Sequence, residues 1–202
     1  MPKSRSRRDT NLRRQLAYIA ARLMAEDGIA DYGAAKMKAA RQAGLVDANL
    51  LPDNQEIEEA LREYQELYQK DEQPAHLRRL REVAVKVMRE FDDFRPALVG
   101  SVLSGTAGMH SDVNLQLFTD DSKALTMFLV NRRYRFEEGS RRIRRGERLD
   151  EVPQISLDVD DVIVTLTVLD RDDERTPVRT KAEAGDAPTR ARLAEVEALL
   201  GP

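Results

Sequence analysis

The sequence contains no cysteine. Disulfide bonds and cysteine-based metal or redox chemistry are therefore excluded. Only two histidines are present, His76 and His110, and histidines so far apart in the chain do not predict a zinc site. No apolar run approaches the roughly 20 residues that a membrane-spanning helix needs, and the basic N-terminus is followed by no apolar stretch typical of a secretory signal. These absences predict a protein that does not enter a membrane, and we expect a cytoplasmic location.

Aromatic residues and net charge are also scarce. There are five Phe and five Tyr, and the formal net charge is −3. Two arginine-rich segments, 3–14 and 132–148, are locally basic. A protein that binds nucleic acid needs basic surfaces of this kind. We expect the first to be a basic tail. Glutamates interrupt the second, so its arginines face either solvent or a phosphate-bearing ligand. The acidic balance and the lack of interleaved aromatic residues disfavour nucleic acid as the partner.

What the chain does contain is a charged surface and regular apolar patterns, with 41% apolar and 34% charged residues. Between 11 and 72 the apolar residues recur at three and four positions, which predicts core-facing helices. The two clearest stripes are Leu12, Leu16, Ile19, Leu23 and Ile57, Leu61, Tyr64, Tyr68. Asp53 or Asn54 is expected to cap the second of these helices, and Pro74 to begin another. The helical segment is interpreted as a substrate or partner arm or as a brace for the rest of the fold.

After Pro96 the period changes to that of strands. "ALVGS" predicts a short buried strand, "DVNLQLF" alternates at two, "DSKALTMFLVNRR" returns to a helix, and "ISLDVDDVIVTLTVL" predicts two strands joined at Asp160 and Asp161. This mixture predicts an α+β fold with a small mixed sheet flanked by helices and preceded by the helical segment. The expected organisation is a disordered basic tail at 1–10, a helical segment at 11–72, an α/β core at 73–170, and a polar linker with a C-terminal helix at 171–202.

The stretch from Leu98 to Asp121 contains the parts of a phosphate and metal site. Glycines such as Gly100 and Gly105 let the backbone approach a triphosphate, and a carboxylate such as Asp112 can hold a divalent ion. Residues 112 and 114 lie two apart on the expected strand, so their side chains share one side. Asp158 lies on the polar face of a later strand and is the best candidate for a third carboxylate. The same residue could instead belong to a turn with Asp160 and Asp161.

The pattern Gly100-Ser101, ten intervening residues, then Asp112-Val113-Asn114 resembles the signature of the polymerase-beta-like nucleotidyltransferase superfamily, most closely its minimal nucleotidyltransferases. The whole chain is also similar to a group of proteobacterial proteins labelled nucleotidyltransferase-like. The resemblance implies a nucleotide site formed by Gly100, Ser101, Gly105 and Ser111. It implies Mg²⁺ held at Asp112, at position 114 and at Asp158, with Asp112 and Asp158 as the catalytic acids.

Position 114 departs from the family pattern, which has a second aspartate there. Asparagine offers one neutral oxygen, so the site loses a negative charge where two divalent ions would be held. Three functions therefore stay open. The first is an enzyme that transfers a nucleoside monophosphate from a nucleoside triphosphate to a hydroxyl group, weakly if at all. The second is an inactive module that senses a nucleotide or binds a protein partner through its N-terminal helices. The third is a nucleic-acid-binding accessory protein.

Overall fold

The computed structural model describes residues 7–29, 31–45, 48–145, 148–175, 179–180 and 190–201, and all structural statements below concern these residues. Within them no helix combines the length and the apolar character needed to cross a bilayer. The predicted α+β class is confirmed, with a mixed sheet that follows an N-terminal helical segment.

The helical segment has a hydrophobic core of its own. It comprises α1 (Arg7–Glu26), α2 (Tyr32–Gln42), a 3₁₀ turn at Ala48–Leu50, and α3 (Asn54–Tyr68). Helix α1 thus begins inside the stretch 1–10 that was expected to be a tail, and residues 1–6 lie outside the described part of the chain. Leu16 of α1 and Ile57 of α3 are completely buried in this core, as the apolar stripes predicted. Alanines of α1 and α2 belong to the same core, and their small side chains permit close packing of the helices.

Local signals set the ends of these helices as expected. The Asp53 carboxylate accepts a hydrogen bond from the Glu56 N–H at 2.9 Å, and the Glu56 side chain accepts one from the Asp53 N–H at 2.7 Å. This reciprocal capping box fixes the first turn of α3. Tyr68, at the end of the α3 stripe, was expected in the core but is 64% exposed. Its ring packs on Tyr64 with the centroids 4.7 Å apart, because the helix outlasts the core that it covers.

The sheet has the order β1-β2-β5-β4-β3-β6. Strands β2 and β5 are parallel, and the other neighbours are antiparallel. The strands are β1 (Ala97–Val99), β2 (Val113–Phe118), β3 (Phe136–Arg145), β4 (Arg148–Val159), β5 (Val162–Leu169) and β6 (Arg179–Thr180). Asp160 and Asp161 join β4 to β5, as predicted, and both have positive φ (54° and 61°). That pair of angles is typical of the tight hairpin turn whose twist matches its strands.

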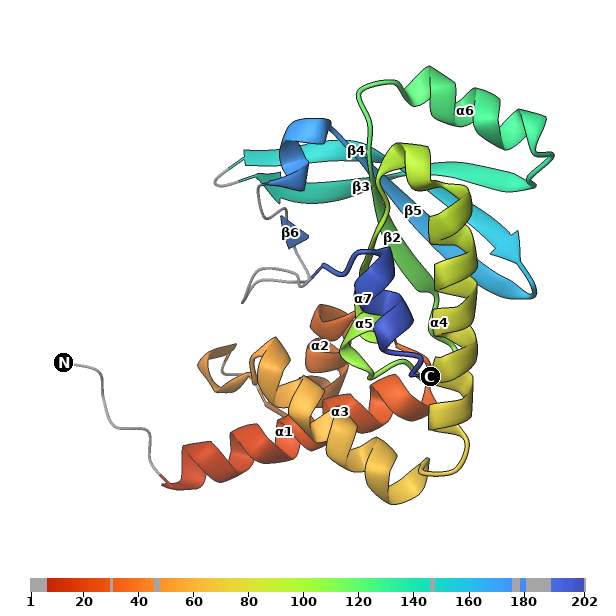
Figure 1. Cartoon of the computed structure of the whole chain (residues 1–202). Coiled ribbons are helices and arrows are strands. Elements are labelled where there is room, and N and C mark those ends of the chain that lie inside the picture. Colours follow the sequence, from red (N-terminus) through yellow and green to blue (C-terminus); the bar gives the residue numbers. More distant parts are fainter. Residues whose placement is uncertain are drawn as a thin grey trace.

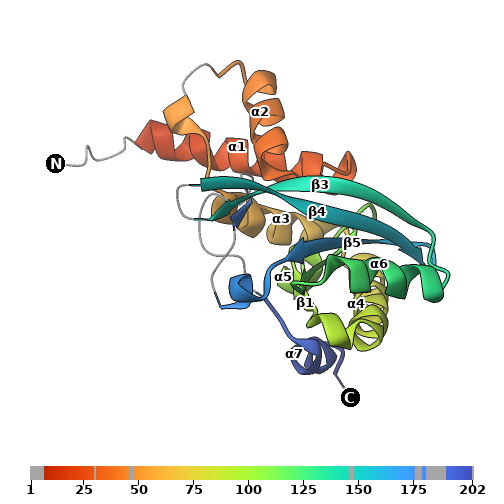
Figure 2. The ribbon, with the colours of Figure 1, turned by 90° about the horizontal axis from the view of Figure 1, so that it is seen from above.

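Helices cover one face of the sheet and complete the main core. They are α4 (Gln73–Glu90), α6 (Ser122–Asn131) and the C-terminal α7 (Leu193–Ala198), with shorter turns at Asp92–Phe94, α5 (Ser101–Ser104) and Arg171–Glu174. Leu80 and Val87 of α4 and Phe91, its C-cap residue, pack on this face and are fully or almost fully buried. Seen from above, the sheet lies between these helices on one side and the helical segment on the other (Figure 2). The segment 171–202 ends in the expected helix, while 181–189 lie outside the described residues.

Figure 1 shows the helical segment beside the end of the sheet at which β2 begins, and β2 carries polar residues on the second face of the sheet. Because side chains alternate along a strand, Val113 and Leu115 enter the core while Asn114 and Gln116 point to the second face. Asn114 is paired with Val99 on β1 and with Thr165 on β5. The alternation therefore brings the end of the glycine loop and the polar residues of β2 to one side of the sheet.

Candidate nucleotide site

The loop after β1 has a backbone that requires glycine at its first position. Gly100 has φ +77° and ψ −156°, a region that side chains other than hydrogen rarely allow. The short helix α5 follows at once, because the Gly100 carbonyl accepts hydrogen bonds from the N–H groups of Leu103 and Ser104 at 3.1 and 3.0 Å. Gly105 then ends α5 in the left-handed conformation, with φ +88°. The small residues of the motif thus produce a sharp reversal directly after the buried strand.

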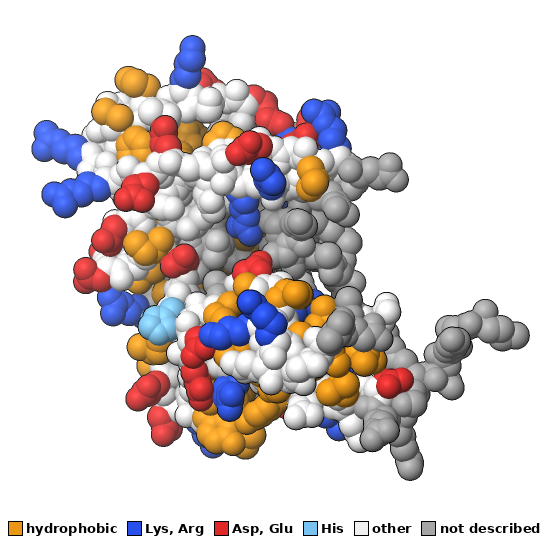
Figure 3. Space-filling view, turned by 180° about the vertical axis from the view of Figure 1, so that it is seen from behind, with side chains coloured by type: hydrophobic (Ala, Val, Ile, Leu, Met, Phe, Trp, Pro, Cys, Tyr) orange, Lys and Arg blue, Asp and Glu red, His pale blue; other side chains and the backbone are white. Residues whose placement is uncertain are grey.

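A cleft of about 920 Å³ separates this loop from the helical segment. Its sheet wall consists of residues from the stretch Val99–Asn114 and of Arg141 from β3. Its helical wall consists of residues from α1, from the start of α2 and from α3. Figure 3 shows the molecule from behind, where hydrophobic side chains gather on the helical segment in the lower half and charged side chains are interspersed among them. A cleft of this size is within the range of small-molecule sites. Gly100, Ser101, Ser111, Asp112 and Asn114 all line it, as expected of site residues.

Asp112 is the least compensated charge of the cleft. Its carboxylate has no hydrogen-bond or ion-pair partner among the described residues. Asp112 is exposed, and partial burial of its carboxylate raises its pKa above the ordinary value. No neighbouring cation offsets the cost of holding this charge, so a bound cation would relieve it.

Asn114 lies beside Asp112, as the two-residue spacing predicted. Its Nδ2 donates a hydrogen bond to the Asp112 carbonyl oxygen at 3.2 Å. The amide therefore turns its nitrogen to the local backbone and has a single neutral oxygen left for a ligand. An aspartate at this position would add a second carboxylate to the same wall of the cleft.

The fold does not place Asp158 near Asp112. It lies within β4, not in the turn, and it is paired with Ile163 of β5. Because β5 lies between β2 and β4, two strand spacings of about 4.8 Å each separate the rows that carry Asp112 and Asp158. Asp158 is exposed and does not line the cleft. Across the described ranges, no three His, Asp or Glu side chains form a group that could hold a metal ion.

The residue that faces the motif from the neighbouring strand is Thr165, which is paired with Asn114. Threonine supplies a hydroxyl group and no charge. Thr165 is 7% exposed and does not line the cleft, so the described part of this wall offers one unpaired carboxylate and one amide where a two-metal site needs several carboxylates. This donor set fits a single Mg²⁺ ion that keeps most of its ligands from phosphate and water.

Two glutamines, one from the helical segment and one from α4, brace the glycine loop from outside the motif. Gln65 of α3 is 5% exposed, and its Nε2 donates a hydrogen bond to the Thr106 carbonyl at 3.0 Å. Gln73 of α4 donates to the carbonyls of Gly105 and Ala107 at 2.9 and 3.0 Å. Buried carbonyls that are satisfied in this way fix the path of a loop, since leaving them unpaired is costly. The helical segment thus acts at least as a brace.

Two of the expected nucleotide-binding residues serve the loop itself. Gly105 does not line the cleft, and its positive φ explains its presence. The Ser111 Oγ accepts a hydrogen bond from the Gly108 N–H at 3.0 Å, which closes the turn before Asp112. His110 packs directly against Gly28, where a Cβ would come within 2.9 Å of the imidazole. This close approach of α1's end to the loop narrows the cleft, and the sequence carried no signal for it.

Three arginines of the segment 132–148 form ion pairs with acids, and they are Arg132, Arg145 and Arg148. Arg145 of β3 pairs with Asp173, Asp150 and Asp170, and the hydrogen bond to Asp173 is the main cause that raises its already high pKa. Arg132 lies 3.7 Å from Glu90. Arg141 lines the cleft, so the segment contributes one residue there.

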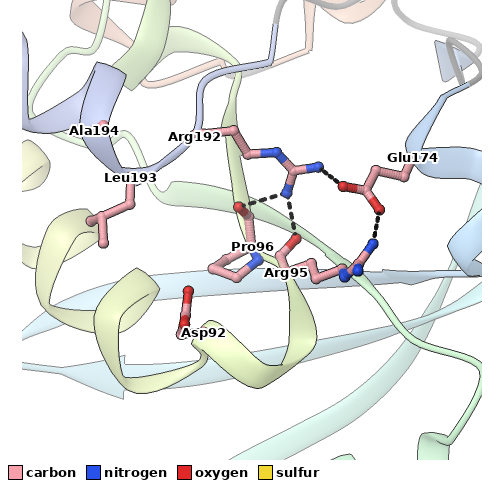
Figure 4. A pocket seen from close by; sticks show the side chains of 7 residues that line it. All are labelled: Asp92, Arg95, Pro96, Glu174, Arg192, Leu193 and Ala194. Carbon is pink, nitrogen blue, oxygen red and sulfur yellow. Dashed lines mark hydrogen bonds and ion pairs between the residues drawn. The ribbon is translucent and has the colours of Figure 1, made fainter.

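A second, smaller pocket of about 270 Å³ lies between α7 and the turn before β1. Its charged groups bind one another (Figure 4). Glu174 accepts from Arg95 at 2.8 Å and from Arg192 at 2.5 Å, and Arg192 also donates to the carbonyl of Arg95 at 2.8 Å. The hydrogen bond from Arg95 is the main cause of a lowered pKa at Glu174. These contacts attach the C-terminal segment to β1 and explain the pocket without a ligand.

Comparison with known proteins finds no match to a family model, to a curated protein or to a solved structure.

Proposed function

We propose that this chain is a nucleotidyltransferase-like protein that binds a nucleoside triphosphate with Mg²⁺ in the cleft and transfers the nucleotide slowly or not at all. The observation that supports it most is the unpaired Asp112 carboxylate, which lies in a cleft next to a glycine-bearing loop. Partial burial of a carboxylate without a partner is unfavourable, and a bound cation would offset that cost.

The residues present fit an ion that arrives with the nucleotide. Mg²⁺ is commonly held by one or two carboxylates together with substrate phosphates and water. Asp112 would supply the carboxylate, and Gly100 and Ser101 would let the phosphates approach the backbone. The bound ion would neutralise charge on the triphosphate. Arg141, from the same cleft, adds a positive charge that suits phosphate.

Slow or absent transfer follows from the missing acids. Nucleotidyl transfer with two metal ions requires carboxylates that bridge them and a base for the incoming hydroxyl group. Position 114 is an amide, the residue paired with it on the adjacent strand is Thr165, and Asp158 lies outside the cleft. The proposal therefore favours a nucleotide-binding module over an efficient enzyme.

Isothermal titration calorimetry with ATP and GTP, with and without Mg²⁺, tests the binding. Asp112→Asn keeps the shape of the side chain and removes its charge, and we expect it to abolish Mg²⁺-dependent binding. Asp158→Asn is the matched control, because it makes the same change on the same face of the sheet but outside the cleft. Unchanged binding in the Asp112 variant, or its loss in the Asp158 variant, would contradict the proposal.

Pyrophosphate release from ATP measures the transfer activity. We expect a rate at the detection limit for the natural chain. Asn114→Asp restores a second carboxylate beside the first and should tighten Mg²⁺ binding in calorimetry. If this substitution leaves Mg²⁺ affinity unchanged, position 114 has no part in a metal site. Rapid turnover by the natural chain, abolished by Asp112→Ala, would show instead that the protein is a full enzyme.

A further inference from the structure

The two walls of the cleft differ in character. Besides Val99, Leu103 and Met109, the sheet wall presents Gly100, Ser101, Asp112 and Asn114, which are small or polar. The helical wall combines apolar side chains with charged ones. The apolar side chains are Met24, Ala25, Ile29, Tyr32 and Leu61, and the charged ones are Asp31, Asp53, Glu58, Glu59 and Arg62. The apolar part of this wall suits a flat or apolar end of a ligand whose phosphate end lies at the sheet wall.

The apolar side chains of the helical wall are held in place from behind. Met24, Ile29 and Tyr32 are half-buried and pack against the core of the helical segment, while the same residues line the cleft. Leu61 is 3% exposed and belongs to that core. Side chains anchored in this way lose little further freedom when they contact a ligand, which favours binding. An aromatic ring such as that of Tyr32 is suited to a planar partner.

Acidic residues on the helical wall orient a nucleotide by repulsion. Asp31 accepts from the Ala34 N–H at 2.6 Å, and Glu58 pairs with Arg62 at 2.8 Å. Glu59 accepts from Gln55 at 3.2 Å. These contacts hold the carboxylates in place within the cleft, and Arg62 compensates the charge of Glu58. Four carboxylates among the described residues, those of Asp31, Asp53, Glu58 and Glu59, line this wall together with one cation, Arg62, so phosphates would be repelled from it. The phosphates are thus directed to the sheet wall, and the other end of the nucleotide to the helical wall.

We propose that the helical wall is the nucleobase-binding half of the site, with Tyr32 as the residue on which the base packs. This inference rests on the proposed function, and it gives the helical segment a direct contact with the ligand besides its role as a brace. The volume of the cleft, about 920 Å³, accommodates a whole nucleotide that spans both walls.

The experiment compares ATP with inorganic tripolyphosphate, which has the phosphates and lacks the base and the sugar. Both are titrated calorimetrically in Mg²⁺ into the natural chain, Tyr32→Ala and Tyr18→Ala. Tyr18 is the matched control, because it lies on α1 outside the cleft and is 40% exposed. We expect ATP to bind the natural chain at least tenfold more tightly than tripolyphosphate. Tyr32→Ala should weaken the binding of ATP at least fivefold, because one base–aromatic contact is lost. The affinity for tripolyphosphate should stay within twofold of that of the natural chain.

The outcomes separate this inference from the proposed function. If ATP and tripolyphosphate bind the natural chain equally well, or if Tyr32→Ala behaves like Tyr18→Ala, the base-binding wall is refuted while the nucleotide site stands. If neither ligand binds, both proposals fail. Binding of tripolyphosphate to Tyr32→Ala also reports that the variant is folded. Should that variant be unfolded, Met24→Gln decides in its place, with the same expected loss for ATP alone.

Discussion

Replacing Gly100 by alanine tests the conformation of the loop on which the candidate site depends. The angles of Gly100, φ +77° and ψ −156°, belong to a region that is essentially restricted to glycine. A Cβ built there would lie 3.9 Å from both Cβ and Nδ2 of Asn114, an ordinary contact distance. The substitution therefore creates no steric clash, and its cost comes from the backbone alone.

The size of the effect follows from two opposing contributions. A side chain forced into this region costs about 1–3 kcal/mol. Alanine also restricts the unfolded chain, which offsets about 0.4–1 kcal/mol of that loss. The expected net loss in the free energy of unfolding is about 1–2 kcal/mol, which lowers the melting temperature of a chain of this size by about 2–8 °C.

Thermal unfolding followed by circular dichroism measures this difference. Gly108→Ala is the control for stability, because Gly108 lies in the same loop, outside the positive-φ region, with no atom within 4 Å of an added Cβ. We expect the control to melt at or slightly above the temperature of the natural chain. If the Gly100 variant melts together with the control, the backbone argument is refuted and the glycine has another purpose.

Three further changes test the packing around the site and the turns that support it. Gln65→Leu leaves the buried Thr106 carbonyl without its donor, so we expect a loss of about 1–3 kcal/mol in urea unfolding and weaker ATP binding. The hydrogen bond from Tyr64 to Glu26 raises the pKa of Tyr64 to about 12, so this contact stabilises the fold fully below pH 10 and is lost as the pH rises through 12. Unfolding curves between pH 9 and 12 should therefore show a falling advantage of the natural chain over Tyr64→Phe, and a constant difference would contradict the linkage. Asp161→Gly relieves a positive φ in the β4–β5 turn and should raise the melting temperature, with a gain of up to about 1 kcal/mol.

Sequence patterns predicted the local structure well, because local structure depends on residues close in the chain. The apolar stripe of α4 predicted which of its residues enter the core, and Asp53 predicted the start of α3. The period-two pattern on both sides of Asp160 and Asp161 predicted the hairpin. Deviations occurred at the ends, where Tyr68 continues a helix beyond its core.

The sequence also placed the glycine loop, Asp112 and Asn114 together, since these residues are neighbours along one turn and one strand. The order of the strands in the sheet could not be predicted from such local patterns. Nothing in the local pattern of β4 and β5 states which of them adjoins β2, and β5 does so in parallel. Tertiary pairing therefore placed Thr165 opposite the motif, and placed Asp158 two strand spacings away from it.

The second wall of the cleft was likewise a result of tertiary structure. Tyr32 and Leu61 are far from the glycine loop in the sequence and meet it because Gln65 and Gly28 contact the loop. By itself the sequence determined the helices, their caps, the hairpin and the single carboxylate of the motif. Only the folded chain decided what faces that carboxylate, because strand order and helix docking depend on long-range burial of surfaces that short-range periodicity does not encode.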